Sequence, residues 1–168
     1  MKSPMACRST GRSRSDGRAG ELRIEAINLD DEVAALLAAA QLPVSDLHSS
    51  HNLNLLGMYD GGRLVGVVGI EVYGEVGLLR SLAVESAHRN AGLGMRLVAD
   101  AEAWAARHGV KTLYLLTTTA AGFFTGLGYV TVPRSNAPAA IAATAQFAGL
   151  CPASSTFMCK VLGNPAQE

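Results

Sequence analysis

The spacing of apolar residues changes after Val84 from the pattern of strands to the pattern of a helix. Before that point, three apolar runs of strand length are joined by tight turns at Asp60-Gly61-Gly62 and around Gly74. These runs predict an antiparallel meander over residues 53–59, 64–72 and 76–84. After Val84, an apolar stripe with helical spacing predicts an amphipathic helix that ends at Gly109; its members are Leu93, Leu97, Ala101 and Trp104.

A fifth strand is predicted over residues 113–116, directly after this helix. Because a strand–helix–strand crossover joins parallel neighbours, strands 76–84 and 113–116 should lie side by side. Around this unit the sequence predicts a strand at 22–27, helices at about 30–41, 120–127 and 138–147, and strands near 129–132 and at 156–162. The expected fold is α/β (α+β), with a mixed, mostly antiparallel sheet of about six to seven strands flanked by helices.

Composition limits the domain organisation and the partners. The 168 residues carry 14 basic and 14 acidic side chains, so no overall charge favours nucleic acid or an anionic membrane. No apolar run is long enough to cross a bilayer. Residues 1–20 hold five basic side chains and one acidic side chain, without apolar periodicity. We therefore expect a disordered basic tail over 1–20 and a single domain over 21–168.

The cysteines and histidines give no sign of a metal centre. Cys7, Cys151 and Cys159 are an odd number and lack the spacing of a disulfide framework or a zinc site. We expect a cytoplasmic protein that contains no metal.

The stretch with the clearest chemical meaning is Arg89-Asn90-Ala91-Gly92-Leu93-Gly94, between a predicted strand and a predicted helix. Glycines permit a close approach of the backbone to a ligand, and the first turn of a helix offers unpaired N–H groups to an anion. Arg89 adds a cation that can pair with phosphate oxygens. The stretch lacks the lysine of a P-loop and the third glycine of a dinucleotide fingerprint.

Arg-x-x-Gly-x-Gly after a meander resembles the pyrophosphate loop of the GNAT superfamily of acyl-CoA-dependent N-acyltransferases. The resemblance implies that acetyl-CoA is the co-substrate and that strands four and five of the sheet splay apart. It also implies that the strand backbone holds the pantetheine arm and that the loop amides hold the pyrophosphate. The implied cofactor-binding residues are Leu82, Ala83, Val84, Arg89, Asn90, Ala91, Gly92, Leu93, Gly94 and Phe124.

Longer segments resemble the arsenic-resistance (ArsN-like) branch of this superfamily. They include Leu42-Pro43-Val44-x-Asp46-Leu47, Glu71-Val72-Tyr73-Gly74, Leu78-Leu79-Arg80-Ser81-Leu82-Ala83-Val84, Leu115-Leu116-Thr117-Thr118-Thr119-Ala120, Phe123-Phe124-x-x-Leu127-Gly128-Tyr129 and Leu150-Cys151-Pro152-Ala153-Ser154. The resemblance implies a homodimeric enzyme that acetylates the α-amino group of a small amino-acid analogue such as arsinothricin or phosphinothricin.

An amino-acid acceptor carries a carboxylate, for which a guanidinium on a rigid strand is a suitable partner. The resemblance implies this role for Arg80, whose alternative interpretation is a surface or edge ion pair with Glu71 or Glu75. It also implies acceptor contacts from Thr117, Tyr73 and His48.

The candidate catalytic groups are two glutamates on either side of the turn at Gly74. Many members of the superfamily carry a glutamate where this chain has Leu79, so Glu75 and Glu71 become the candidate bases, either one acting through water. Many relatives also use a tyrosine to protonate the leaving thiolate, where this chain has the pair Phe123-Phe124. Two alternative functions stay open: a catalytically silent acyl-CoA-binding module, and an N-acetyltransferase for a peptide or a polyamine.

Overall fold

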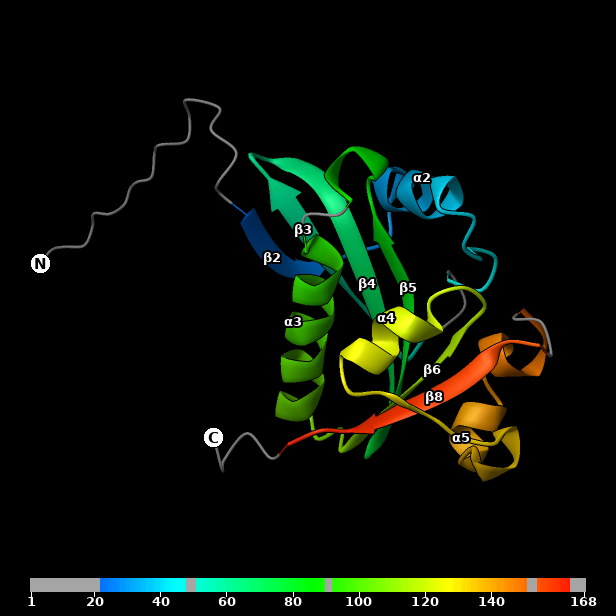
Figure 1. The fold of residues 1–168 in the computed structure, drawn as a ribbon. Helices are drawn as coiled ribbons and strands as arrows, with labels where there is room; N and C mark the ends of the chain where they lie inside the picture. Colours follow the sequence, from blue (N-terminus) through cyan, green and yellow to red (C-terminus); the bar gives the residue numbers. More distant parts are fainter. Residues whose placement is uncertain (1–21, 48–50, 90–91, 151–153, 164–168) are drawn as a thin grey trace, which may run out of the picture.

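The computed structural model describes residues 22–47, 51–89, 92–150 and 154–163. Within them the strands form one seven-stranded sheet in the order β2-β3-β4-β5-β6-β8-β7 (Figure 1). The strands are β2 (Leu22–Ile27), β3 (Leu53–Asp60), β4 (Arg63–Tyr73), β5 (Val76–Val84), β6 (Thr112–Thr117), β7 (Val130–Thr131) and β8 (Thr156–Val161). The mixed, mostly antiparallel sheet predicted from the sequence is thereby confirmed.

Strands β2 to β5 form the predicted meander, each antiparallel to the next. The β3–β4 turn places Gly61 at φ 61° and Gly62 at φ 91°, values that glycine adopts without a steric penalty. The period-two alternation of these strands sends successive side chains to opposite faces of the sheet.

Strand β5 pairs in parallel with β6 over only three positions, Val76 with Thr112, Gly77 with Leu113 and Leu78 with Tyr114. Beyond Leu78 the two strands separate, which confirms the predicted splay. Two irregularities lie close to this point. The β4–β5 register shifts between Val67 and Gly69, and Ser81 has a positive φ of 59°.

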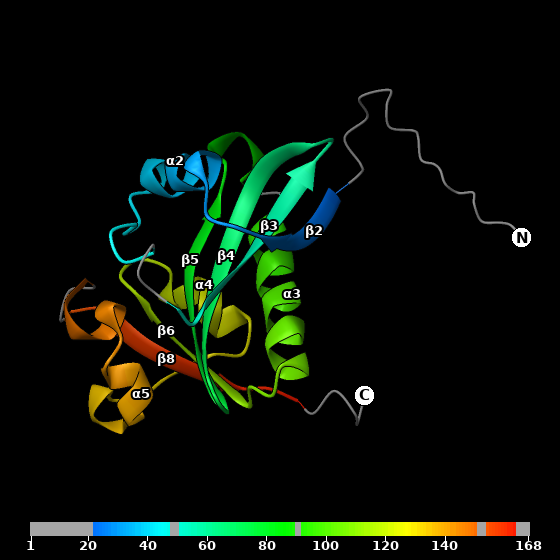
Figure 2. The same cartoon turned by 180° about the vertical axis from the view of Figure 1, so that it is seen from behind.

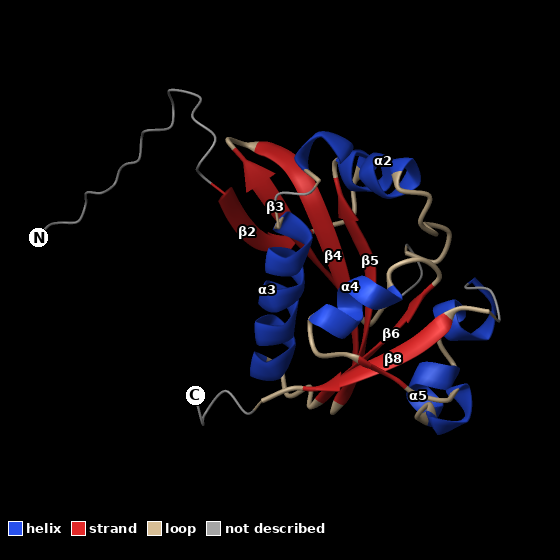
Figure 3. Cartoon of the chain, in the orientation of Figure 1, coloured by secondary structure: helices blue, strands red, loops and turns tan. Residues whose placement is uncertain are grey.

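The helices cover both faces of the sheet (Figures 2 and 3). The longest, α3 (Leu93–Arg107), buries Leu97 against Met58 and Ile70 on the face that the short helix α4 (Ala121–Gly126) also covers. The opposite face packs against α2 (Asp31–Ala39), whose first turn is capped by the Asp30 carboxylate. None of the helices in the described ranges is both long and apolar enough to cross a membrane.

The segment after Pro138 differs from the single helical run that the sequence predicts. It forms a short helix, α5 (Ala139–Ala142), and then a π-helical turn, η4 (Gln146–Leu150). The Thr144 hydroxyl donates to the carbonyl of Ile141 at 2.7 Å and accepts from the amide of Phe147 at 3.2 Å. This side chain competes with the backbone for hydrogen bonds, and the α-helix ends there. Ile141 still packs against Leu78 of β5, so the segment covers the sheet beside the splay.

Candidate active site

A cavity of about 490 Å³ lies where β5 and β6 separate. One wall comes from β5, the opposite wall from β6 and α4, and the rim from the segment that follows α2. The lining residues are Ala40, Gln41, Leu42, Pro43, Leu79, Arg80, Ser81, Leu82, Leu115, Leu116, Thr117, Thr118, Thr119, Ala120, Phe124 and Gln146. The cavity therefore lies between the diverging strands, and Arg80 is the charged residue in this lining.

The N-terminus of α3 lies beside this cavity. A Cβ at Gly94 would lie 3.4 Å from the Phe123 ring, and the next residue, Phe124, lines the cavity. The helix begins at Gly92, which has φ 79°, provides no capping side chain, and is followed by a first turn without acidic residues. Its first amides therefore present a positive dipole end suited to an anion. Arg89 Nε donates to the carbonyl of Val84 at 3.0 Å, which connects the loop to the end of β5.

Arg80 is held by two carboxylates inside the protein. Its Nη2 donates to Asp46 Oδ1 at 2.8 Å, and its Nη1 donates to Asp46 Oδ2 and, at 2.7 Å, to Glu71 Oε2. Nε donates to Ser81 Oγ at 3.0 Å. The Arg80 side chain is 0% exposed, against 3% for Glu71 and 13% for Asp46. The interpretation of Arg80 as a surface or edge ion pair is therefore wrong: the pair with Glu71 exists, but it is buried.

These contacts shift the pKa values of Asp46, Arg80 and Tyr73. The hydrogen bonds from Arg80 hold the pKa of Asp46 below its ordinary value, against the opposing effect of burial. Burial disfavours the charge on Arg80, but its bonds to Asp46 and Glu71 outweigh burial and raise its pKa. Tyr73 donates its hydroxyl proton to Glu71 Oε1, and burial together with this bond raises the pKa of Tyr73. One guanidinium thus faces two carboxylates, which leaves one negative charge in excess.

The other predicted residues divide between the cavity and places outside it. Leu82 and Phe124 line it, whereas Ala83 packs into the core beneath α2. Thr117 lines it too, but its Oγ1 accepts from the amide of Ala120 at 2.9 Å and so supports the turn into α4. Glu75 lies at the closed end of the splay, with its side chain 71% exposed and 3.3 Å from Lys111 Nζ. His48, Asn90 and Ala91, like residues 1–20 and 151–153, fall outside the described residues.

The sequence prediction assigned no site role to two residues of this region, although Asp46 belongs to one of the segments that carry the resemblance. Asp46 stands in a polar segment after α2, and nothing in its spacing connects it with Arg80, 34 positions later. Gln146 belongs to η4, lines the cavity and is buried, yet its neighbours in sequence show no regular pattern. A buried aspartate in a loop without apolar periodicity is recognisable only by its tertiary partner.

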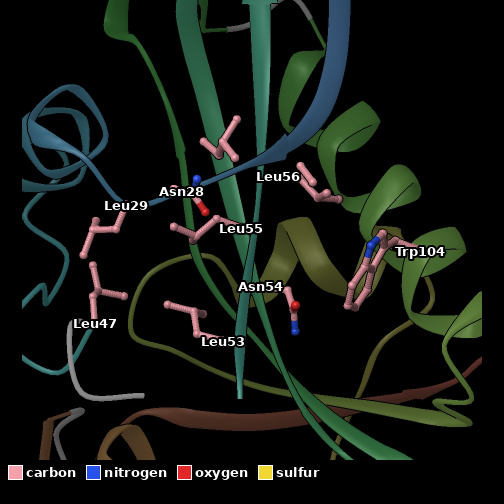
Figure 4. A pocket seen from close by; sticks show the side chains of 10 residues that line it. Asn28, Leu29, Leu47, Leu53, Asn54, Leu55, Leu56 and Trp104 are labelled. Atoms are coloured by element: carbon pink, nitrogen blue, oxygen red, sulfur yellow. The ribbon is translucent and has the colours of Figure 1, made fainter. Parts of the chain in front are cut away.

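A second hollow, of about 300 Å³, lies at the β2 side of the sheet (Figure 4). Leu47 and Leu53 are on one side of β3 and Trp104 of α3 is on the other. Its lining contains no titratable side chain; the amide of Asn54 donates to the carbonyls of Asn52 and Ile70. Within the described part of the chain, no three His, Cys, Asp or Glu side chains are grouped so as to hold a metal ion. The β5–β6 cavity, which lies at the splay and beside the N-terminus of α3, is the candidate reaction site.

Comparison with known proteins agrees with this geometry. The profile of the acetyltransferase (GNAT) family matches residues 23–129. An uncharacterized N-acetyltransferase of Chlorobaculum tepidum is 36% identical over 78 residues, which are 46% of this chain and 50% of that protein. The chain therefore spans half the length of this relative.

Two solved structures show the same fold. N-acetylglutamate synthase from Neisseria gonorrhoeae, complexed with coenzyme A and N-acetyl-glutamate, superposes with a TM-score of 0.72 at 20% identity over 87% of this chain and 36% of that one. Rv2747 from Mycobacterium tuberculosis, in complex with CoA, superposes with a TM-score of 0.63 at 18% identity over 79% of this chain and 95% of that one.

Proposed function

This chain belongs to the acetyltransferase (GNAT) family, and we propose that it transfers the acetyl group of acetyl-CoA directly to the amine of a small amino-acid-like acceptor. The observation that carries the proposal is the cavity between β5 and β6, which has Arg80 in its wall and the N-terminus of α3 beside it. An anionic cofactor and a carboxylate-bearing acceptor can then meet in one space.

The cofactor side of the proposal uses backbone groups. After Leu78 the edge of β5 that faces β6 is no longer paired with it, and the amides of a pantetheine arm can pair there instead. The pyrophosphate would lie against the first turn of α3, where Gly92 and Gly94 place no side chain in its way. The two structural relatives named above were solved with coenzyme A, which supports a coenzyme A cofactor for this chain.

The acceptor side of the proposal uses the buried cluster. Arg80 binds the carboxylate of the acceptor, and Glu71 removes a proton from its ammonium group through a water molecule. Of the two predicted bases, only Glu71 contacts a residue of the cavity wall, since Glu75 is exposed beside Lys111.

The transfer itself is a simple exchange of bonds. The neutral amine attacks the thioester carbonyl and an N–C bond forms; the nitrogen then loses a proton to solvent, and the C–S bond breaks with release of the thiolate. Phe124 offers no hydroxyl, so solvent supplies the proton that the thiolate takes up.

We assign the acceptor to the class of arsinothricin and phosphinothricin, which makes the enzyme a resistance factor against such antimetabolites. Parts of two segments that carry this resemblance, residues 42–43 and 115–120, line the cavity. We also propose that the protein is a homodimer in the cytoplasm. Light scattering of the purified protein would test the oligomeric state.

One observation favours a second candidate function. Because Asp46 and Glu71 together outweigh the charge of Arg80, the cluster attracts a cationic amine that has no carboxylate, such as a polyamine. In the first candidate the cluster recognises a negatively charged carboxylate, and in the second it recognises a positively charged amine.

Thiol release from acetyl-CoA, followed with a panel of acceptors, tests the proposal. The panel contains phosphinothricin, arsinothricin, glutamate, methionine sulfoximine, spermidine and a peptide with a free N-terminus. Saturable turnover with the amino-acid analogues alone supports the proposal, and turnover with spermidine alone supports the second candidate. Acetyl-CoA binding without turnover on any acceptor would contradict both and indicate a binding module.

A further inference from the structure

We propose that Asp46 is an acceptor-selectivity residue, which occupies Arg80 as the carboxylate of the acceptor would and must leave it before that carboxylate binds. The inference rests on the proposed function, since it needs an acceptor that carries a carboxylate. Asp46 takes no part in the proposed acetyl transfer, in which Arg80 binds the acceptor and Glu71 removes the proton.

The hydrogen-bonding capacity of Arg80 is nearly exhausted. A guanidinium has five N–H groups, and four of them donate to Asp46, Glu71 and Ser81. The side chain is also fully buried. A substrate carboxylate therefore cannot form a bidentate pair with Arg80 until one of the present partners gives up its place.

Asp46 is the partner that can be exchanged. Its two carboxylate oxygens accept from Nη1 and Nη2, which is the geometry that a bound carboxylate would adopt. It lies on the segment between α2 and β3 and is 13% exposed. Glu71 lies on β4, is 3% exposed, and uses its second oxygen to accept from Tyr73.

The segment that carries Asp46 also forms part of the cavity. Gln41, Leu42 and Pro43 line it, and Leu47 is buried in the core under α2. Arg80 itself lines this cavity, so movement of the Asp46 side chain out of the cluster would free the guanidinium for an acceptor bound there. Leu47, the next residue, is buried in the core under α2, so the exchange needs a movement of the Asp46 side chain and not of the whole segment.

The exchange conserves the number of buried ion pairs. An incoming carboxylate replaces Asp46 on the guanidinium, and the displaced Asp46 regains water. An acceptor without a carboxylate cannot replace it. Because Asp46 is bound in the unliganded protein, the apparent affinity for carboxylate acceptors is reduced by the small fraction of molecules in which Arg80 is available.

Calorimetric titration of the full chain with phosphinothricin, and separately with the carboxamide of its α-carboxylate, tests the inference without requiring turnover. Asp46→Asn and Asp46→Ala are compared with the wild type, and Asp100→Asn on the exposed side of α3 is the matched control. We expect both Asp46 variants to bind phosphinothricin more tightly by about fivefold or more, with no change for the carboxamide or for the control. Melting temperatures verify that each variant is folded.

Unchanged or weaker binding of phosphinothricin by the folded Asp46 variants would overturn the inference; weaker binding would identify Asp46 as the partner of the acceptor ammonium. Absence of binding to every form of the protein would overturn it as well. Kinetics separate this inference from the proposed function. Tighter binding without any acetyl transfer leaves the role of Asp46 intact and contradicts the enzymatic proposal, whereas a lower KM at an unchanged kcat supports both.

Discussion

Glu71 Oε2 accepts a hydrogen bond from Arg80 Nη1 at 2.7 Å across two neighbouring strands, and neither side chain is more than 3% exposed. A buried ion pair of this kind is costly to form from solvated groups, and it is costly to break on one side. Asp46 is the third member of this buried cluster, and Arg80 is the member that lines the β5–β6 cavity.

Replacement of Arg80 by alanine removes the guanidinium that Asp46 and Glu71 share. We expect the free energy of unfolding to fall by about 3–5 kcal/mol, because both buried carboxylates lose the positive charge that balances them. We also expect KM for an amino-acid acceptor to rise about tenfold or more in the folded fraction. Denaturant titration and steady-state kinetics measure the two effects.

Arg63→Ala is the control for this variant, because Arg63 also pairs with a glutamate, Glu85, but is 67% exposed. An exposed pair contributes about 0–1 kcal/mol, so little should change. Equal losses for Arg63→Ala and Arg80→Ala would contradict the importance of burial.

Glu71→Gln and Glu75→Gln distinguish the two candidate bases. Both substitutions keep the side-chain shape and remove the charge. If Glu71 takes up the proton, kcat of Glu71→Gln should fall about 100-fold or more. Glu75→Gln should keep the wild-type kcat, because its side chain is exposed beside Lys111 at the closed end of the splay. A kcat that responds only to Glu75→Gln would reverse the assignment.

Gly94→Leu tests the pyrophosphate loop. A Cβ at this position meets nothing closer than the Phe123 ring at 3.4 Å, and leucine favours helices, so the fold should persist. The larger side chain would obstruct the first turn of α3, and we expect the Kd of acetyl-CoA to rise about tenfold or more.

Gly126→Leu is the matched control for Gly94→Leu, since a Cβ at Gly126 has no atom within 4 Å. Gly92 is less suitable for this test, because its φ of 79° makes any substitution strained. Unchanged acetyl-CoA affinity in folded Gly94→Leu would remove the loop from the cofactor site.

The loss of folding stability at acidic pH should depend on Asp46. The pKa of Asp46 in the folded protein is lowered from 3.8 by Arg80, so the folded state binds fewer protons than the unfolded state in this range. Its contribution to stability is complete above the ordinary pKa and is lost as pH falls through the folded value. The free energy of unfolding should therefore decrease between about pH 5 and pH 2, and less so in Asp46→Asn. Identical profiles would show that other carboxylates dominate.

Removal of residues 1–20 should leave kcat/KM and the melting temperature unchanged. The segment has a basic, non-periodic composition, and no site prediction falls within it. Kinetics of the shortened chain on the best acceptor of the panel provide the measurement. Reduced activity would assign a function to the tail.

Local sequence patterns predict most of the elements and their order. Apolar runs along residues 53–84, glycines at the turns, and the Leu93–Leu97–Ala101 stripe of α3 predict strands and a helix without knowledge of contacts. The crossover rule then places β6 parallel to β5, as observed. The run after Pro138 was predicted as one helix, because the hydrogen bonds of the Thr144 hydroxyl leave no periodic trace.

Which charges meet depends on the tertiary structure. Arg80 is recognisable as a strand arginine and Glu71 as one of its two possible partners, but the burial of Arg80 and its contact with Asp46, 34 positions away, are not. Glu71 and Glu75 stand four positions apart at one hairpin and have opposite environments, one buried against Arg80 and one exposed. Electrostatic interactions depend on distance in space and on burial. Both follow from the packing of β4, β5 and the segment after α2, which no local pattern encodes.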